Sequence, residues 1–365
     1  MATISKPRVF FYYFLMLIFS ILFLAIAAEL MVRLLVPKEN FWPISNIYQA
    51  VDSPGVSYTL KPNFEGTAFG VDLKTNSIGF RGPQWSVKKP GGTFRIVLIG
   101  DSHAFAYGVP FENSVGEKLA DMLNERGDVY YEVLNFAVNA YNSQQELAVL
   151  REYALQYDPD LVIVIASSND HDPTPIVDED GWLYSGFQTV TPQPPAIDES
   201  IKRIQLTEVS WLTKNSHLLL YLHLLKKKYQ LAQKAQVQRH LQTSSSDSCW
   251  LGAFPSGSIS ERLYQSVYLP LRAMIHEAKR RNIPIIIANF NAFLDYRKMF
   301  KKLSEEQKVP MLELLTLFPE ACSWQELLEQ VGLGWNDHLN AIAHQRWAIA
   351  LAELMEKEGF SIVPK

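Results

Sequence analysis

Short apolar runs alternate with amphipathic segments from Phe94 onward, and this alternation limits the fold more than any other feature of the sequence. The runs are rich in Val, Ile and Leu and lie at 94–99, 130–136, 161–167, 283–290 and 309–314. The amphipathic segments lie at 113–126, 143–157, 261–281, 293–306 and 341–358. Near-continuous apolar strands that alternate with helices are typical of a parallel sheet covered on both faces. The sequence therefore predicts an α/β domain of three α/β/α layers around a doubly wound, five-stranded parallel sheet.

The N-terminal segment Val9–Ala28 contains twenty residues and no charge. A helix of this length spans about 30 Å, the thickness of the hydrocarbon core of a bilayer. A cleaved signal peptide is the alternative, because Ala25-Ile26-Ala27 offers a small-residue cleavage site. The apolar part of a signal peptide usually has only about 7–15 residues, however. We therefore predict a single-pass transmembrane anchor with a short cytoplasmic N-terminus and the remaining chain on the extracytoplasmic side, periplasmic or extracellular.

Composition divides the rest of the chain into segments. Residues 1–33 form the cytoplasmic tip and anchor, and 34–93 are rich in Pro, Gly and Asn, which predicts a juxtamembrane region of short strands and loops. The main domain is expected at 94–358, with 359–365 as a tail. A helical insertion at about 172–258 interrupts it, with leucines at Leu218, Leu222 and Leu225. The insertion can lie over the active-site edge as a lid or on a membrane surface, or pack on its own domain, which we favour.

Charge and cysteine content exclude several function classes. The formal net charge is −4, without the basic excess that nucleic-acid binding requires. The sequence has no glycine-rich phosphate-binding motif, and we expect no cofactor and no metal. The two cysteines, Cys249 and Cys322, are too few for a disulfide scaffold or a cysteine metal site. On the oxidising side of a membrane they form either a disulfide or two buried thiols, and the sequence leaves both open.

The first apolar run ends in Gly100-Asp101-Ser102, at the carboxyl end of a predicted strand. Sites in doubly wound sheets lie at this edge, which makes Ser102 a candidate nucleophile. A serine needs a base that removes its proton. His338 stands on the loop before the final helix, and this loop can return to the same edge. We rank His171 second and expect His344, inside the start of the helix, to be a packed or capping residue. We do not expect His103 to face Ser102, because adjacent side chains rarely face each other.

The same edge offers donors for an oxyanion. A backbone N–H near Ala140 follows the second strand, the side-chain amide of Asn169 follows the third, and the Ser102 N–H is the third donor. Each residue alone is more simply explained as a turn, a helix cap or a surface side chain. Their joint placement after successive strands favours a catalytic site. Asp101 and Asp170 are interpreted as structural, because aspartates in turns bond nearby backbone.

These segments resemble the SGNH (GDSL) hydrolase superfamily, and in particular its membrane-anchored bacterial members. "GDSHAFAYG" resembles the first conserved block of the family, "NFAVNAYN" the second, "SSND" the third and "NDHLN" the last, and "TNSIGFRGPQWSVKKPGGTFRIVLIGDS" resembles the lead-in. The resemblance covers about residues 55–170 and 260–358. It implies a flavodoxin-like fold and an ester hydrolase. The site residues implied are Ser102 as nucleophile, His338 as base, and Ser102, Ala140 and Asn169 as the oxyanion hole.

Three positions depart from the family pattern. Ala140 and Ser167 replace glycines of the second and third blocks, and the Ser167 side chain is expected to narrow the site. The Ala140 N–H keeps its role if the loop does not need a positive φ. Trp335 stands where the family has its acid. Either Asp337 orients the His338 imidazole, or another group such as a backbone carbonyl does.

The predicted function is that of an extracytoplasmic serine esterase, which removes acyl groups, acetyl included, from an envelope glycan or lipid. Its expected partners are this acylated substrate and the membrane. One alternative is an acyltransferase that acts on a polysaccharide. A second is a non-catalytic module with a partner in a cell-envelope assembly, which the altered acid position favours and the retention of Ser102, Asn169 and His338 opposes.

Overall fold

The computed structural model describes residues 6–35, 47–177, 181–184, 216–226, 260–333 and 338–360, apart from gaps at 54, 126, 128, 182, 217, 220, 223–225 and 292–293. Several predictions therefore lie outside the described residues. These are most of the insertion at 172–258, the tail, and the positions Trp335, Asp337 and Cys249.

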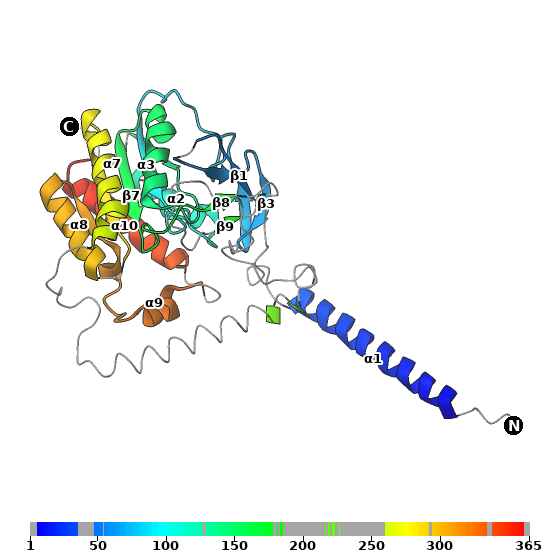
Figure 1. Cartoon of the computed structure of the whole chain (residues 1–365). Helices are drawn as coiled ribbons and strands as arrows, with labels where there is room; N and C mark the ends of the chain where they lie inside the picture. Colours follow the sequence, from blue (N-terminus) through cyan, green and yellow to red (C-terminus); the bar gives the residue numbers. More distant parts are fainter. Residues whose placement is uncertain are drawn as a thin grey trace, which may run out of the picture.

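A five-stranded parallel sheet forms the centre of the domain (Figure 1). Its strands are β5 (Thr93–Gly100), β6 (Tyr130–Asn135), β7 (Leu161–Ala166), β10 (Ile285–Asn289) and β11 (Met311–Glu313). They lie in the order β11-β10-β7-β5-β6, and every neighbouring pair is parallel. In chain order this is 2-1-3-4-5, the flavodoxin-like arrangement. The predicted fold is confirmed, and the fully buried β7 and β10 explain why their sequences are continuously apolar.

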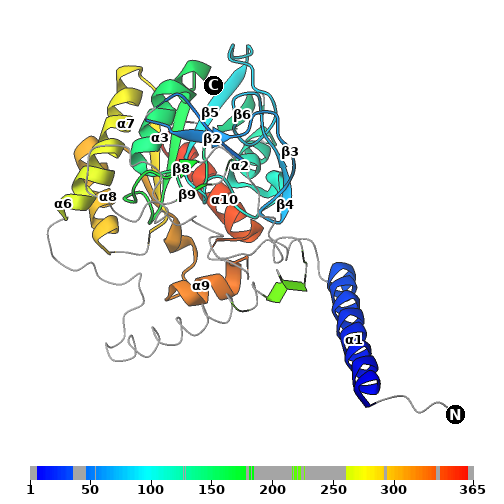
Figure 2. The same cartoon turned by 45° about the vertical axis from the view of Figure 1, so that its right-hand side comes forward.

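The direction of the chain across the sheet decides which face each helix covers. The step from β5 to β6 runs one way, and the steps to β7, β10 and β11 run the other way. Right-handed crossovers therefore place α2 (Val115–Asn124) on one face and α3 (Ser143–Glu152), α7 (Leu269–Arg280) and α8 (Leu294–Gln307) on the other. The last helix, α10 (Ala341–Lys357), packs against α2, while α3 packs against α7 (Figure 2).

Some helices are shorter than the sequence pattern predicts. The segment 143–157 divides into α3 and the short η3 (Ala154–Tyr157). The segment 261–281 divides into α6 (Glu261–Leu263), the π-helical η4 (Tyr264–Tyr268) and α7. Pro270 lies in the first turn of α7, where its missing N–H interrupts the regular helical ladder. The helix α9 (Trp324–Val331) was not predicted, because its eight residues lie in a region without a long helical period.

Short antiparallel pairs precede the sheet. They are β1 (Tyr48–Ala50) with β2 (Tyr58–Leu60) and β3 (Glu65–Ala68) with β4 (Val71–Lys74), and β8 (Ile176–Val177) pairs with β9 (Leu183–Tyr184) after β7. Tyr58, Leu73 and Phe80 are fully buried in the hydrophobic core that also contains β5. The region before β5 therefore packs into the domain of the central sheet from residue 47 onward.

The N-terminal helix α1 (Lys6–Leu35) projects from this core, against which Val32 near its C-terminal end packs (Figures 1 and 2). Within Phe10–Leu35, an 18-residue stretch has a mean hydropathy of 2.6, and none of this stretch is buried inside the molecule. By length and composition the helix can cross a membrane. Near its C-terminal end, Glu29 accepts hydrogen bonds from Ser216 Oγ at 2.7 Å and the Leu218 N–H at 2.9 Å, which ties the insertion to this end of α1.

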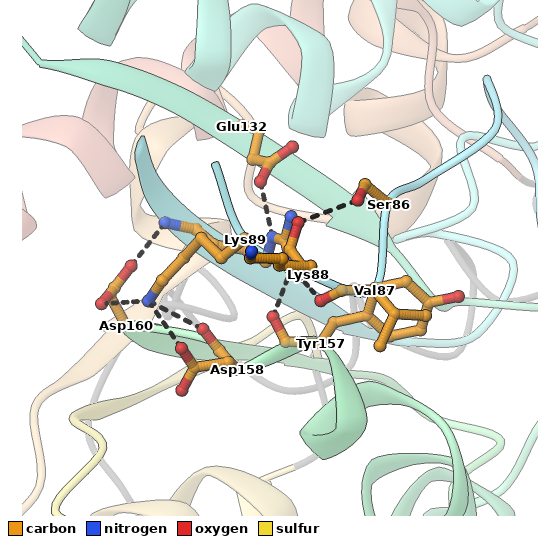
Figure 3. A network of polar contacts seen from close by, with 9 residues as sticks. Ser86, Val87, Lys88, Lys89, Glu132, Tyr157, Asp158 and Asp160 are labelled. Atoms are coloured by element: carbon orange, nitrogen blue, oxygen red, sulfur yellow. Dashed lines mark hydrogen bonds and ion pairs between the residues drawn. The ribbon is translucent and has the colours of Figure 1, made fainter. Parts of the chain in front are cut away.

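A network of charged groups closes the amino edge of the sheet (Figure 3). The Arg95 side chain of β5 is fully buried, and its Nε donates to Glu132 of β6 at 2.5 Å. Its Nη1 donates to the Val87 carbonyl at 3.1 Å and the Tyr157 carbonyl at 2.5 Å. Asp160 accepts from the Arg95 N–H at 2.7 Å and pairs with Lys89 at 2.8 Å. This network ties the lead-in to the starts of β5, β6 and β7.

Candidate active site

The loop after β5 turns sharply because of Gly100. A Cβ at this position would lie 2.6 Å from the Ala104 Cβ and 2.7 Å from the Ile165 carbonyl oxygen, so only glycine allows this approach. The Tyr107 N–H then donates back to the Ser102 carbonyl at 3.0 Å. Asp101 is buried and accepts from the His103 N–H at 2.9 Å, as expected of a structural turn aspartate. The loop presents Ser102 at the carboxyl edge of the sheet.

Ser102 and His338 meet at this edge although 236 positions separate them. The distance between Ser102 Oγ and His338 Nε2 is 2.8 Å, which is a hydrogen bond. His338 is held from both sides: its carbonyl accepts from the Leu333 N–H at 3.0 Å, and Asn340 caps α10 by accepting from the Ile342 N–H. The structure thus brings the two residues together as predicted. It describes neither Asp337 nor Trp335, so the question of an orienting acid stays a prediction.

Two aromatic rings contact the His338 imidazole. The Tyr107 ring is stacked on it, with centroids 4.5 Å apart and an interplanar angle of 24°. The His103 ring lies 4.9 Å away and also packs against Phe290 at 4.7 Å. The turn after Gly100 bends the chain and places the His103 ring beside His338, a contact that the sequence did not predict. The contact of Tyr107 with His338 was not predicted, because no spacing pattern in the sequence connects these two residues.

The loops after β6 and β7 are joined side by side. Asn169 Nδ2 donates to the Tyr141 carbonyl at 3.1 Å, next to Ala140. Ser167 Oγ donates to Asp101 at 2.6 Å and lies 2.5 Å from Asn169 Oδ1. Because Ser167 is 1% exposed and points to these two residues, its side chain bridges the first and third loops. This contradicts the expectation that Ser167 narrows the site.

The loop after β6 places Ala140 in the left-handed conformation, so the condition that this loop does not need a positive φ is not met. Ala140 has a φ of +61°, a region that costs an L-residue about 1–2 kcal/mol. The glycine usual in the family at this position would meet this demand without strain. The Ala140 N–H is still present, so the substitution changes the cost of the loop and leaves the predicted donor in place.

Residues 96–240 match the family model described as GDSL-like Lipase/Acylhydrolase. The chain carries a GDSL-like lipase/acylhydrolase domain. The match begins in β5 and includes the loops of Ser102, Ala140 and Asn169, while His338 lies beyond it. It confirms the resemblance and the prediction that the chain is an ester hydrolase. No curated protein matches the chain.

Three solved structures are similar to this GDSL-like domain. Esterase EstA from Pseudoalteromonas sp. has 13% identity and a TM-score of 0.40, and the match covers 72% of this chain and 97% of that chain. The lipase/acylhydrolase from Enterococcus faecalis has 10% identity and a TM-score of 0.39, covering 73% and 96%. The acetyl xylan esterase AlAXEase has 11% identity and a TM-score of 0.38, covering 73% and 99%.

Buried carboxyl groups lie beneath the site of the GDSL-like domain. Glu146 on α3 and Asp170 after β7 are both at most 1% exposed. Burial raises the pKa of Glu146 well above its ordinary value, and the nearby carboxyls of Asp170 and Asp101 raise it further. Burial likewise raises the pKa of Asp170, with Asp101 adding to the effect. The burial of Glu146 was not predicted. An acidic residue among the apolar residues of the 143–157 segment could have indicated it.

The remaining histidines have other environments. His344 is 2% exposed on α10, and burial lowers its pKa to about 3, with the neighbouring His103, Arg81 and His338 adding to the effect. It is therefore neutral and packed, as expected. His171 contacts the Tyr296 hydroxyl through Nδ1, and Arg262 donates to its carbonyl at 3.4 Å. These contacts join His171 to Tyr296 of α8. The hydrogen bond to Ser102 is made by His338.

Proposed function

We propose that this GDSL-like domain is a membrane-anchored serine esterase that removes acyl groups from an envelope glycan or lipid on the extracytoplasmic side. The observation that carries the proposal is the 2.8 Å contact between Ser102 Oγ and His338 Nε2. This is the geometry by which a base activates a serine nucleophile. It also favours an enzyme over a non-catalytic module, which would have no need of the pair.

The proposed reaction begins with proton transfer from Ser102 Oγ to His338 Nε2 as the oxygen attacks the acyl carbonyl carbon. The negative charge that develops on the carbonyl oxygen is stabilised by the Ser102 N–H, the Ala140 N–H and the Asn169 amide. His338 then returns the proton to the departing alcohol, and the acyl group stays on Ser102. Water, deprotonated by His338, attacks this ester and releases the carboxylic acid.

The helix α1 supports the proposed location. It is long and apolar enough to span a bilayer, and a single N-terminal anchor usually leaves the following domain outside the cytoplasm. The proposed substrates follow from that location, because acylated glycans and lipids are the esters that an envelope-facing site meets. A labelling reagent that does not cross membranes tests the orientation: it should modify lysines of the domain, such as Lys298, in intact cells or spheroplasts.

The function itself is tested on the purified full chain in detergent. Hydrolysis of 4-nitrophenyl esters should proceed in the wild type and disappear in Ser102→Ala. The substrate class is then tested by acetate release from an acetylated polysaccharide and by fatty-acid release from lipid vesicles. If neither artificial nor natural esters are cleaved by the folded chain, the esterase proposal is wrong. Transfer of the acyl group to an added polysaccharide, in place of its release, would identify the acyltransferase instead.

A further inference from the structure

Arg81 lies in the lead-in before β5, yet its side chain reaches the loop that follows Ser102. Its Nη1 donates to the carbonyl oxygens of Phe105 at 3.0 Å and Ala106 at 2.9 Å, and its Nη2 donates to that of Val109 at 2.7 Å. The residue is 2% exposed. One guanidinium therefore holds three carbonyls of the loop 103–109 in a fixed relation, which its planar fork is suited to do.

The loop needs such support because its backbone is strained. Ala106 has a φ of +63°, a conformation that L-residues adopt at a cost. The Ala106 carbonyl is also one of the three that Arg81 binds. Phe105 packs against the guanidinium, with the Arg81 Cζ 5.2 Å from its ring centroid. Strained loops persist only where surrounding contacts fix them, and Arg81 supplies these contacts.

The Arg81 guanidinium is also buried at a cost. Burial lowers the pKa of Arg81 to about 10, although the through-space attraction of Glu112 and Glu117 opposes this shift. Because burial of a charged group costs free energy, we expect this cation to do more than fill space in the core. Its bonds to the carbonyls of the loop after Ser102 indicate what it does.

The loop that Arg81 holds connects Ser102 with Tyr107, the residue whose ring contacts the base. Ser102 begins it, and Tyr107 lies between the carbonyls of Ala106 and Val109 that Arg81 binds. The Tyr107 ring is stacked on the His338 imidazole at 4.5 Å. A shift of the loop would therefore move the nucleophile and the ring that positions the base together.

We propose that Arg81 is a positioning residue for the esterase reaction, holding the 103–109 loop so that Ser102 and the Tyr107 ring keep their places against His338. The proposal rests on the proposed function, since it concerns the reactivity of the same serine. Arg81 touches neither the substrate nor the reacting atoms.

Arg95 provides the matched control. It is equally buried, and it also donates to backbone carbonyls, those of Val87 and Tyr157, but at the opposite edge of the sheet. A merely structural role for Arg81 predicts that Arg81→Met and Arg95→Met behave alike once folded. The experiment compares both variants, Arg81→Lys and the wild type as full chains, at a temperature where all are folded. It measures the rate of Ser102 labelling by a fluorophosphonate, and kcat and KM for an ester.

For Arg81→Met we expect labelling and kcat to fall about 10²-fold, the scale of a reacting group displaced by about 1 Å, with KM nearly unchanged. Arg81→Lys should recover part of the loss, because an ammonium can donate to these carbonyls without the rigid fork. Arg95→Met should stay within about 3-fold of the wild type. Equal rates for folded Arg81→Met and Arg95→Met would overturn the proposal. If Arg81→Met does not fold, wild-type rates in Arg81→Lys would overturn it.

A second measurement separates this proposal from the proposed function. Hydrogen exchange of the backbone N–H groups in 103–109 reports the loop without requiring any reaction. We expect faster exchange there in Arg81→Met and Arg81→Lys, and no change there in Arg95→Met. If the wild type is never labelled, the esterase proposal fails, and exchange still decides whether Arg81 holds the loop. Unchanged exchange in the Arg81 variants would overturn that role too.

Discussion

The two edges of the central sheet differ in how their buried groups are satisfied. At the amino edge, the buried Arg95 is paired with Glu132 and the partly exposed Lys89 with Asp160, so each cation faces a carboxylate (Figure 3). At the carboxyl edge, the Arg81 guanidinium meets backbone carbonyls, and burial, together with the nearby Asp170, raises the pKa of Glu146. The carboxyl edge also holds two alanines in the left-handed conformation, at 106 and 140.

Backbone strain does not separate the two edges, because Asp158, Asn282 and Lys308, which precede β7, β10 and β11, are also left-handed. The difference lies in what surrounds the buried guanidinium groups of Arg95 and Arg81. Around Arg95, the carboxylate of Glu132 neutralises the charge of the guanidinium. At the carboxyl edge, the loop that follows the nucleophile is held by a guanidinium that bonds to its backbone carbonyls. We therefore expect changes to Ser102, His338 and Arg81 at the carboxyl edge to alter reactivity more than stability, and changes to the Arg95 network at the amino edge to do the reverse.

The largest effect is expected for the Ser102–His338 pair. Ser102→Ala and His338→Ala should each lower ester hydrolysis by about 10³-fold or more, because removing either partner of a nucleophile–base pair removes the activated oxygen. The melting temperature should change little. His171→Ala is the control at the same edge and should keep most of the activity. A His338→Ala variant as active as the wild type would contradict the role of His338 as the base for Ser102.

The next effect belongs to the amino edge. Arg95→Met should lower the free energy of unfolding by about 3 kcal/mol, because it leaves the partly buried Glu132 without its cation and two carbonyls without a donor. Denaturant unfolding followed by circular dichroism measures this change. The rate of Ser102 labelling in the folded variant should stay near that of the wild type. A loss of reactivity as large as the loss of stability would show that the two edges are not separable.

A smaller effect concerns the buried carboxyl group of Glu146. Its pKa is raised in the folded chain, so its contribution to stability is complete below the unfolded pKa near 4.5 and is lost as the pH rises above it. Glu146→Gln cannot ionise, and it should therefore gain stability relative to the wild type between pH 5 and pH 8, by roughly 1–3 kcal/mol. Unfolding at both pH values checks this. The exposed Glu305→Gln is the control, and a gain of equal size there would refute the explanation.

The smallest effect tests the strain at position 140. Ala140→Gly should raise the free energy of unfolding by about 0.5 kcal/mol, because relief of about 1–2 kcal/mol of left-handed strain is partly offset by the greater freedom of glycine in the unfolded chain. Thermal unfolding of both proteins measures it. The oxyanion donor at this position is a backbone N–H, so labelling of Ser102 should be unchanged. A destabilised Ala140→Gly would mean that the alanine side chain makes contacts that outweigh the strain.

The sequence predicts the sheet well because each strand is buried on both faces and is therefore apolar throughout. Ser102, Asn169 and His338 could be placed at one edge because parallel strands end together, and the structure joins Ser102 to His338 through Oγ and Nε2. The positive φ of Ala140 could not be predicted, because an alanine in a sequence does not indicate its backbone angle.

Other parts of the site were out of reach for physical reasons. The stacking of Tyr107 on His338 joins residues far apart in the chain, and it depends on the exact path of a tight turn. Arg81 lies in a motif that the resemblance to the family included, but its role appears only when its guanidinium is seen on the carbonyls of Phe105, Ala106 and Val109. Sequence patterns predict which face of a helix is buried and which residues lie at one edge of the sheet. Contacts between loops depend on the path of the backbone and are seen only in the structure.

The most direct measurement maps the site of covalent labelling on the full chain. The wild type, His338→Ala and His171→Ala are exposed to a fluorophosphonate, digested, and analysed by mass spectrometry. The account predicts a single adduct on Ser102 in the wild type and in His171→Ala, and a strong loss of that adduct in His338→Ala. A folded wild type without an adduct on Ser102, or an adduct that does not depend on His338, would contradict it.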